Sequence, residues 1–248
     1  MVTVVFPAAG AGRRMKAGMN KVFLELAGKP ILVHTLLQFS RSSLVDNFVV
    51  VVAAEEVGFI SKLLRGIPGL KPLKVVAGGT ERQYSIWNGL KAAPEEAEIL
   101  LVHDAARPLV SLATIEGVIE GAREVGGAIA AVPEKNTIKV VGEDRLVQST
   151  PARSTLWEVQ TPQGFRRDIL FRANEQAEAD GFLGTDDSSL VERLGVPVKV
   201  VESDYRNIKV TTPEDLIIAE ALLREDYGGF LGLAKAAARK TAAHILHQ

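Results

Sequence analysis

The chain has 248 residues, 47% hydrophobic and 24% charged, and its 29 basic and 30 acidic residues leave a net charge of −1. This near-neutral charge excludes a general electrostatic attraction to nucleic acids or anionic membranes, so any polyanion must be bound by a local basic site. The absence of cysteine excludes a disulfide framework, a thiolate nucleophile, a zinc finger and an iron–sulfur cluster, and it agrees with a cytoplasmic location. No stretch reaches the roughly 18 apolar residues of a membrane helix, and the first apolar run lacks the preceding charges of a secretory signal. We therefore expect a protein that uses neither nucleic acid nor membrane as a partner.

Short apolar runs alternate with segments of helical spacing along most of the chain. In chain order we predict a strand at Val2–Pro7, a helix at Ile31–Ser40, a strand at Asn47–Ala53, a helix at Glu55–Leu64, a strand at Lys74–Val76, a helix at Arg82–Ala92, a strand at Glu98–His103, a helix at Leu112–Val125, a strand at Gly127–Val132, a helix at Arg167–Ala179, a strand at Val198–Glu202 and a helix at Pro213–Arg224. Unbroken apolar strands separated by helices are typical of a parallel sheet covered on both faces. The sequence therefore predicts an α/β fold, in which a single doubly wound, mostly parallel sheet makes residues 1–248 one domain.

Two segments depart from this alternation. Ile138–Val141 and Arg145–Gln148 flank Gly142-Glu143-Asp144, a pattern that indicates a β-hairpin within an arm of about residues 137–158. A hairpin that projects from a wound sheet needs its apolar face covered, so we expect it to pack on a second subunit; the alternative is a flap folded on its own domain. The alanine-rich tail, residues 228–248, is predicted to be helical and is either a surface helix or a dimer contact.

A glycine-rich loop follows the first strand. Ligands of open α/β sheets bind beyond the carboxyl ends of the strands, and Gly10 and Gly12 allow backbone N–H groups to approach a phosphate. Arg13, Arg14 and Lys21 add three cations close to these glycines. The loop lacks the third glycine of the dinucleotide fingerprint and the Gly-Lys-Ser/Thr of a P-loop. It therefore indicates polyphosphate binding of another kind, or else a tight strand–helix turn with solvated arginines.

Two more motifs follow strands and are expected on the same rim of the sheet. Gly78-Gly79-Thr80-Glu81-Arg82, with Ser85, again permits close approach of a ligand such as a base or ribose, or it is an ordinary loop with Thr80 as an N-cap. Asp104, within His103-Asp104-Ala105-Ala106-Arg107-Pro108, places a carboxylate where a Mg²⁺–nucleotide complex would lie. The alternatives for Asp104 are a helix N-cap or an ion-pair partner of Arg107. His103 is expected to be a packed structural residue rather than a base.

Three late groups combine hydroxyl side chains with a lysine between apolar residues. They are Thr161-Pro162-Gln163, Thr185-Asp186-Asp187-Ser188 and Arg206-Asn207-Ile208-Lys209-Val210-Thr211. Together they suit a small phosphorylated polyol. The Thr185-Asp186-Asp187 group would serve equally as the capped start of a helix.

These motifs occur together in the order and spacing of one known family. Pro7-Ala-Ala-Gly-x-Gly-x-Arg14-Met15, Lys21, Gly78-Gly79, Ser85, His103-Asp-Ala-Ala-Arg107-Pro108, Thr161-Pro-Gln, Thr185-Asp186 and Asn207-Ile-Lys209-Val recur over roughly residues 2–222. In this the chain resembles the 2-C-methyl-D-erythritol 4-phosphate cytidylyltransferases of non-mevalonate isoprenoid synthesis. The first signature is shared by many sugar-nucleotide pyrophosphorylases, whereas the motifs around Asp104 and Asn207 are more specific.

The resemblance implies a homodimeric enzyme that uses Mg²⁺ to join CTP to a polyol phosphate, with release of pyrophosphate. It implies Arg14 and Lys21 as the catalytic residues, which stabilise the transition state at the α-phosphate. CTP would be bound by Pro7, Ala8, Ala9, Gly10, Ala11, Gly12, Gly79, Thr80, Ser85, Asp104 and Ala105, and Asp104 would also hold the metal. The polyol phosphate would be bound by Arg107, Thr137, Arg153, Thr161, Thr185 and Lys209, with Arg153 supplied by the arm of the partner subunit.

The chemistry agrees with these residue types, because the attacking group is itself a phosphate oxygen and needs charge neutralisation rather than a general base. Asn20, Val22 and Thr80 depart from the frequent Pro, Gln and Asp of the family, but none of these changes removes a catalytic charge. Asn207 is a candidate second metal contact.

Three alternative functions stay open at this point. The first is a cytidylyltransferase for another polyol phosphate such as ribitol 5-phosphate. The others are a nicotinamide-dependent oxidoreductase, which the missing third glycine opposes, and a non-catalytic nucleotide-binding regulator, which the retained charges oppose.

Overall fold

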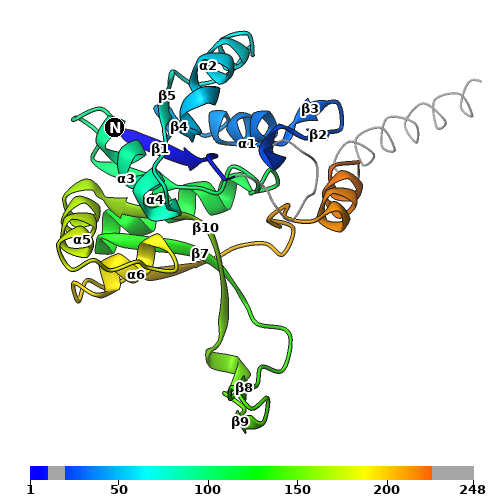
Figure 1. The fold of residues 1–248 in the computed structure, drawn as a ribbon, viewed down its shortest axis with the longest axis vertical. Helices are drawn as coiled ribbons and strands as arrows, with labels where there is room; N and C mark the ends of the chain where they lie inside the picture. The colour runs from blue at the N-terminus through cyan, green and yellow to red at the C-terminus, as the bar shows by residue number, and fades with distance from the viewer. Residues whose placement is uncertain (11–19, 225–248) are drawn as a thin grey trace, which may run out of the picture.

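The computed structural model describes residues 1–10 and 20–224 (Figure 1). Within these residues seven strands form one sheet in the order β11-β7-β10-β6-β1-β4-β5, and all neighbouring pairs are parallel except those made by β10. The strands are β1 (Val2–Pro7), β4 (Asn47–Val52), β5 (Leu73–Ala77), β6 (Ile99–Val102), β7 (Gly127–Pro133), β10 (Trp157–Arg166) and β11 (Lys199–Glu202). The predicted mostly parallel sheet is confirmed.

Helices cover both faces of this sheet. The labelled helices are α1 (Ile31–Ser40), α2 (Val57–Arg65), α3 (Arg82–Ala92), α4 (Leu112–Val125), α5 (Arg167–Ala179) and α6 (Asp187–Glu192). Buried side chains of α1, α2 and α4 form one core with one face of the sheet, and those of α3, α5 and α6 form a second core with the other face. In the first core Phe6 packs edge-on against Phe39 and Phe48, with ring centroids 5.2 and 5.3 Å away. The strands are therefore apolar on both sides, as a doubly wound fold requires.

Most predicted boundaries agree with the structure to within one or two residues. The helix expected from Glu55 instead begins with a 3₁₀ turn at Ala54–Glu56, and α2 follows it. The last predicted helix is present over residues 213–224 of the described chain, where Thr212 Oγ1 accepts a hydrogen bond from Asp215 N at 3.4 Å as the expected N-cap. This helix buries Ala219 and Leu223 against Leu26 and the start of α1.

The strand β10 was not predicted, because Pro162 lacks the N–H that a central strand donates to its neighbour. In the structure β10 lies antiparallel between β7 and β6, and its register against β7 shifts between Val159 and Gln163, around this proline. Thr161 and Gln163 consequently lie 5% and 1% exposed within the sheet, rather than in a surface loop.

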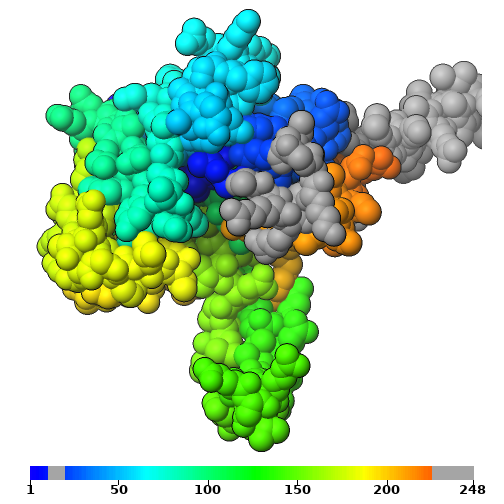
Figure 2. All heavy atoms as spheres, in the orientation of Figure 1, coloured from blue at the N-terminus to red at the C-terminus, as the bar shows by residue number. Residues whose placement is uncertain are grey.

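Between β7 and β10 the chain leaves the sheet as a projecting arm (Figures 1 and 2). Near its tip β8 (Val140–Val141) and β9 (Val147–Ser149) pair antiparallel, which confirms the predicted hairpin. The arm does not fold back onto its own domain, and its apolar side chains stay exposed, with 49% of Val141, 66% of Leu146 and 60% of Val147 accessible.

The remaining elements are small. A two-stranded ribbon pairs β2 (Glu25–Leu26) with β3 (Lys29–Pro30), and a 3₁₀ turn spans Arg153–Thr155 on the arm. The predicted tail, residues 228–248, lies outside the described residues. Within the described ranges no helix has the length and apolar character needed to cross a bilayer.

Candidate active site

A cleft of about 340 Å³ opens at the carboxyl ends of β1, β5 and β6. It is lined by Pro7, Ala8, Ala9, Gly10, Asn20, Lys21, Val22, Gly79, Thr80, Glu81, Arg82, Ser85, Asp104, Ala105, Ala106, Lys209 and Thr211. Parallel strands end at the same edge of a sheet, so the three strand-end loops of the sequence meet here. The cleft thus collects the described members of the predicted CTP set together with Lys21 and Lys209.

Other predicted residues do not line this cleft. Arg14, Ala11 and Gly12 lie outside the described residues. Thr137 and Arg153 are exposed on the arm, where Arg153 Nη1 donates to the Lys135 carbonyl at 3.0 Å.

Thr185, Arg107 and Thr161 also lie outside the lining. Thr185 is exposed just before α6, and Asp186 is the N-cap of that helix, with Oδ1 accepting from Ser189 N at 3.0 Å. The alternative reading of this group as a capped helix start is therefore confirmed. Arg107 and Thr161 lie behind Asp104, within the protein.

The loop after β5 is closed by Ser85. The Ser85 hydroxyl accepts a hydrogen bond from Gly79 N at 3.0 Å, which folds the loop over the first turn of α3. A Cβ at Gly78 would lie 2.8 Å from Ser85 Oγ and 2.9 Å from the Ala9 Cβ, so this position needs glycine to let the two loops meet. Thr80 is not the N-cap of α3; that position is Glu81, and Thr80 faces the cleft.

The turn that carries Lys21 is anchored by Asn20. The side-chain amide of Asn20 donates to the Ala8 carbonyl at the end of β1, and Val22 is buried in the core beneath. These two departures from the family pattern therefore tie the turn to the sheet. Lys21 Nζ donates to the Val210 carbonyl at 3.0 Å, so its ammonium lies across the cleft next to the loop that carries Lys209.

Asp104 is the electrostatic centre of the cleft. Its Oδ2 lies 2.9 Å from Lys209 Nζ and 3.3 Å from Arg107 Nε, and its Oδ1 lies 4.0 Å from Arg82 Nη2. Burial by itself raises the pKa of Asp104, but the charges of Lys209, Arg107 and Arg82 outweigh burial and hold that pKa below its usual range. The carboxylate is therefore ionised at any working pH, and three cations surround one anion.

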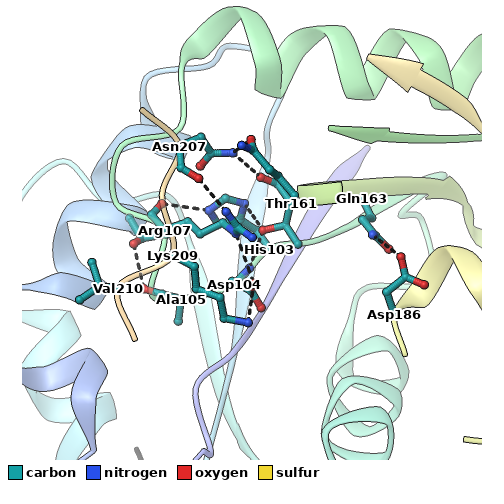
Figure 3. Close-up of polar contacts among 12 residues, drawn as sticks. His103, Asp104, Ala105, Arg107, Thr161, Gln163, Asp186, Asn207, Lys209 and Val210 are labelled. Atoms are coloured by element: carbon teal, nitrogen blue, oxygen red, sulfur yellow. Dashed lines mark hydrogen bonds and ion pairs between the residues drawn. The ribbon is translucent and has the colours of Figure 1, made fainter. Parts of the chain in front are cut away.

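Behind Asp104, His103 and Thr161 form a buried hydrogen-bond chain (Figure 3). Asp104 N donates to Thr161 Oγ1 at 3.0 Å, Thr161 Oγ1 lies 3.1 Å from His103 Nδ1, and His103 Nε2 lies 3.1 Å from the Arg107 carbonyl. Burial lowers the pKa of His103 to about 3, so the imidazole is neutral. This confirms the expected packed, structural character of His103.

Asn207 joins β10 to the Lys209 loop. Its side-chain Nδ2 donates to Gln160 Oε1 and to the Thr161 carbonyl, both at 2.8 Å, while its backbone carbonyl accepts from Arg107 Nη1 at 2.7 Å. Asn207 is fully buried and does not line the cleft, so its suggested metal contact stays a prediction that the geometry does not favour.

Arg82 lines the cleft but was not assigned a role from the sequence. Its Nη2 lies 3.1 Å from Asp187 Oδ2 and faces Asp104 on the other side. Asp187 is 2% exposed, and its pKa is raised by burial although Arg82 opposes this. The position of Arg82 just after the glycine pair that follows β5 could have indicated a role in the cleft. Its buried partner, the Asp187 carboxylate, is too distant in sequence to have been expected.

The donor set fits a divalent cation of the Mg²⁺ type. Asp104 Oδ1 accepts no hydrogen bond from the described residues and lies in a cleft that Lys21, Arg82 and Lys209 also line. In the described ranges, this cleft included, no group of three or more His, Cys, Asp or Glu side chains converges that could hold a metal ion. Mg²⁺ commonly takes one or two protein carboxylates and completes its shell with water and substrate phosphates, which is compatible with one aspartate.

An open α/β sheet with a cationic cleft beyond its parallel strands is the architecture of nucleotide-binding enzymes. The family model of 2-C-methyl-D-erythritol 4-phosphate cytidylyltransferase matches residues 2–225 of the chain. The enzyme of that name from Bacillus licheniformis is 48% identical over 223 residues, 90% of this chain and 96% of the relative. The one from Symbiobacterium thermophilum is 50% identical over 225 residues, 91% of this chain and 94% of the relative.

A solved structure agrees with these relatives. The crystal structure of 4-diphosphocytidyl-2C-methyl-D-erythritol synthase from Anaerococcus prevotii superimposes with a TM-score of 0.80 at 33% identity, covering 90% of this chain and 98% of that one. The chain belongs to the 2-C-methyl-D-erythritol 4-phosphate cytidylyltransferase family, a family of nucleotidyltransferases.

Proposed function

We propose that this protein transfers the cytidylyl group of CTP to 2-C-methyl-D-erythritol 4-phosphate, giving CDP-methylerythritol and pyrophosphate for isoprenoid precursor synthesis. One structural observation carries the proposal in a chain of this family: Lys21, Lys209 and Asp104 converge in one cleft at the carboxyl edge of the sheet. A non-catalytic regulator would need the same nucleotide loops, but it would not need cations gathered where two phosphates meet.

The reaction is a displacement at phosphorus. A phosphate oxygen of the acceptor attacks the α-phosphorus of CTP, the bond from that phosphorus to the bridging oxygen of the β-phosphate breaks, and the electron pair leaves with pyrophosphate. The nucleophile is already anionic, so the protein must neutralise charge and position two phosphates. Lys21, together with Arg14 from outside the described residues, would stabilise the charge that develops at the α-phosphate.

The loops after β1, β5 and β6 would hold CTP. Ala8, Ala9 and Gly10 line the cleft beside Gly79, and the Ser85 hydroxyl fixes the shape of the second loop. Asp104 would hold Mg²⁺, which when bound neutralises triphosphate charge and orients the leaving pyrophosphate.

The acceptor phosphate would be bound by Lys209 and by residues of a second copy of the chain. Thr137 and Arg153 lie on the arm and do not line the cleft of their own chain, and the hairpin itself carries exposed apolar residues. A homodimer in which each arm reaches the partner's cleft would cover those residues and complete each site. The same acceptor set is proposed to include Thr185, Arg107 and Thr161.

Two further predictions remain part of this proposal. Residues 1–248 would act as one nucleotidylyltransferase domain, with the arm within it and the tail appended to it. The enzyme would work in the cytoplasm.

The deciding experiment measures pyrophosphate release by the purified protein. We expect release with CTP, Mg²⁺ and 2-C-methyl-D-erythritol 4-phosphate together, and none when any one is omitted. A higher kcat/KM with ribitol 5-phosphate would make the acceptor assignment wrong. Absence of release with every nucleoside triphosphate and acceptor would make the enzyme assignment wrong.

The shared site is tested by mixing two inactive variants, Lys21→Met and Arg153→Ala. If Arg153 acts across the dimer, a mixed dimer contains one site with both residues intact, so activity returns after subunit exchange. If Arg153 acts within its own chain, every site in the mixture lacks one residue and the activity stays absent.

A further inference from the structure

The loop of residues 209–211 brings together both lysines of the cleft. Lys209 Nζ lies 2.9 Å from Asp104 Oδ2 (Figure 3), and the Val210 carbonyl accepts a hydrogen bond from Lys21 Nζ at 3.0 Å. Thr211 lines the cleft beside them. A shift of this loop would therefore move one lysine through its own backbone and the other through the carbonyl that receives it.

Asp215 fixes this loop although it does not itself line the cleft. Its Oδ2 accepts hydrogen bonds from Thr211 N at 2.8 Å, from Thr211 Oγ1 at 2.7 Å and from Thr212 N at 2.8 Å. Burial by itself raises the pKa of Asp215, but the hydrogen bonds from Thr211 and Thr212 outweigh burial and hold that pKa below its usual range. One oxygen of an ionised carboxylate thus accepts three bonds, and such charge-assisted bonds are stronger than those between neutral groups.

Helix capping explains only part of this arrangement. The helix of residues 213–224 begins after Thr212, whose Oγ1 accepts from Asp215 N at 3.4 Å, and Asp215 Oδ2 accepts from Thr212 N in return. This reciprocal pair is a capping box, which stabilises the start of a helix. The two bonds from Thr211 lie outside the capping box, because they fix a residue that precedes the cap and lines the cleft.

We propose that Asp215 is a positioning residue that holds Lys21 and Lys209 in place for the two phosphates. The inference rests on the proposed function, since it assigns a role in that reaction to a residue outside the cleft lining. Lys21 would stabilise the transition state, so its displacement lowers kcat, whereas Lys209 would bind the acceptor phosphate, so its displacement raises the acceptor KM. A residue that only caps the helix would contribute to stability and would leave both constants unchanged.

The test is a double-mutant cycle that combines Asp215→Ala with Lys21→Met. Asp215→Ala alone should lower kcat and raise the acceptor KM, each by about tenfold, because a small displacement of a positioned group is costly. In the Lys21→Met protein no ammonium is left there for Asp215 to position. Asp215→Ala should then change kcat less than about twofold, while the acceptor KM still rises through Lys209. Both constants are measured by pyrophosphate release at saturating CTP and Mg²⁺.

Thr212→Ala is the matched control. It removes the hydroxyl that caps the helix and keeps the three hydrogen bonds of Asp215 Oδ2, which use only the backbone N of Thr212. Ser111→Ala is a second control, because Ser111 Oγ is the N-cap of α4, accepts from Thr114 N at 3.1 Å and does not line the cleft. Both variants should lower the thermal midpoint, as loss of a cap does, and should keep kcat and acceptor KM within about twofold of wild type.

The cycle decides the inference. An equal loss of kcat from Asp215→Ala with and without Lys21 would overturn it, because Asp215 would then act independently of that lysine. Constants that match those of Thr212→Ala would overturn it too and would leave Asp215 a helix cap. Should Asp215→Ala not fold, Asp215→Asn keeps the shape of the side chain, removes its charge and enters the same cycle with the same two contrasting outcomes. A wild type that releases no pyrophosphate from CTP and the acceptor would instead overturn the proposed function.

Discussion

Lys21 contributes its charge to the cleft from a turn whose geometry is set by neighbours on either side. Asn20 ties the turn to the end of β1, and Lys21 itself contacts the Val210 carbonyl. Replacing Lys21 by Met should lower kcat by about 10²–10³, the usual cost of one lost transition-state donor, with little effect on folding. The measurement is pyrophosphate release at saturating substrates.

Lys62→Met on the exposed face of α2 is the control for loss of a lysine charge elsewhere. Equal rates for Lys21→Met and Lys62→Met would contradict the role of Lys21.

Asp104 links the chemistry of the cleft to the stability of the fold. Its pKa is depressed in the folded protein, so its ion pairs stabilise the fold above the unfolded-state pKa of about 3.9, and this stabilisation is lost as the pH falls below that value. Asp104→Asn leaves Lys209 and the largely buried Arg107 without their carboxylate partner, while Arg82 keeps Asp187, and we expect a loss of about 2 kcal/mol at pH 7.

Urea unfolding at pH 7, 5 and 3.5 checks this expectation. The difference between wild type and Asp104→Asn should be constant from pH 7 to 5 and should shrink at pH 3.5. Glu96→Gln, an exposed substitution, should show no such trend. A difference that grows on acidification would show that the ion pairs are not the source of the stabilisation.

Among the elements, the arm combines an apolar sequence with an exposed position. Its hairpin carries exposed apolar side chains, which the described residues of the same chain leave uncovered. Leu146→Asp should therefore convert a dimer to a monomer, as seen by sedimentation, and should lower activity as much as Arg153→Ala does. The thermal midpoint of the monomer should stay within a few degrees of wild type at low protein concentration, because Leu146 contributes little to the core of its own chain.

Phe59→Asp on α2 is the matched control, since Phe59 and Leu146 are equally exposed at 66%. A Leu146→Asp protein that remains dimeric would show that the arm is not the contact.

β10 shows where sequence patterns fail at the scale of elements. Helices with long apolar periodicity, such as α1 and α4, were predicted to the residue, because a helix is determined by contacts within a few residues of itself. β10 contains a proline and polar residues in its middle, and it is a strand because β6 and β7 on either side supply its hydrogen-bond partners. Local propensity carries no information about such neighbours.

At the scale of the whole molecule, the family match ends at residue 225, and the relatives cover about nine tenths of this chain. The catalytic and binding residues proposed here all precede that point. Truncation after Gly229 should therefore leave kcat/KM within twofold of the full chain, measured by pyrophosphate release. A drop of tenfold or more, with folding intact by circular dichroism, would assign the tail a part in catalysis or assembly.

The sequence by itself determined the alternation of strands and helices, the arm's hairpin, and three strand-end loops that must share one edge of a parallel sheet. Those features depend on short-range periodicity and on the geometry common to all parallel sheets. Only the tertiary structure decided that Thr161 lies behind Asp104, that Arg82 is held between Asp104 and Asp187, and that Arg153 does not line the cleft of its own chain. These relations join residues far apart in the chain, and their distances are set by how the elements pack, which spacing along the sequence does not encode.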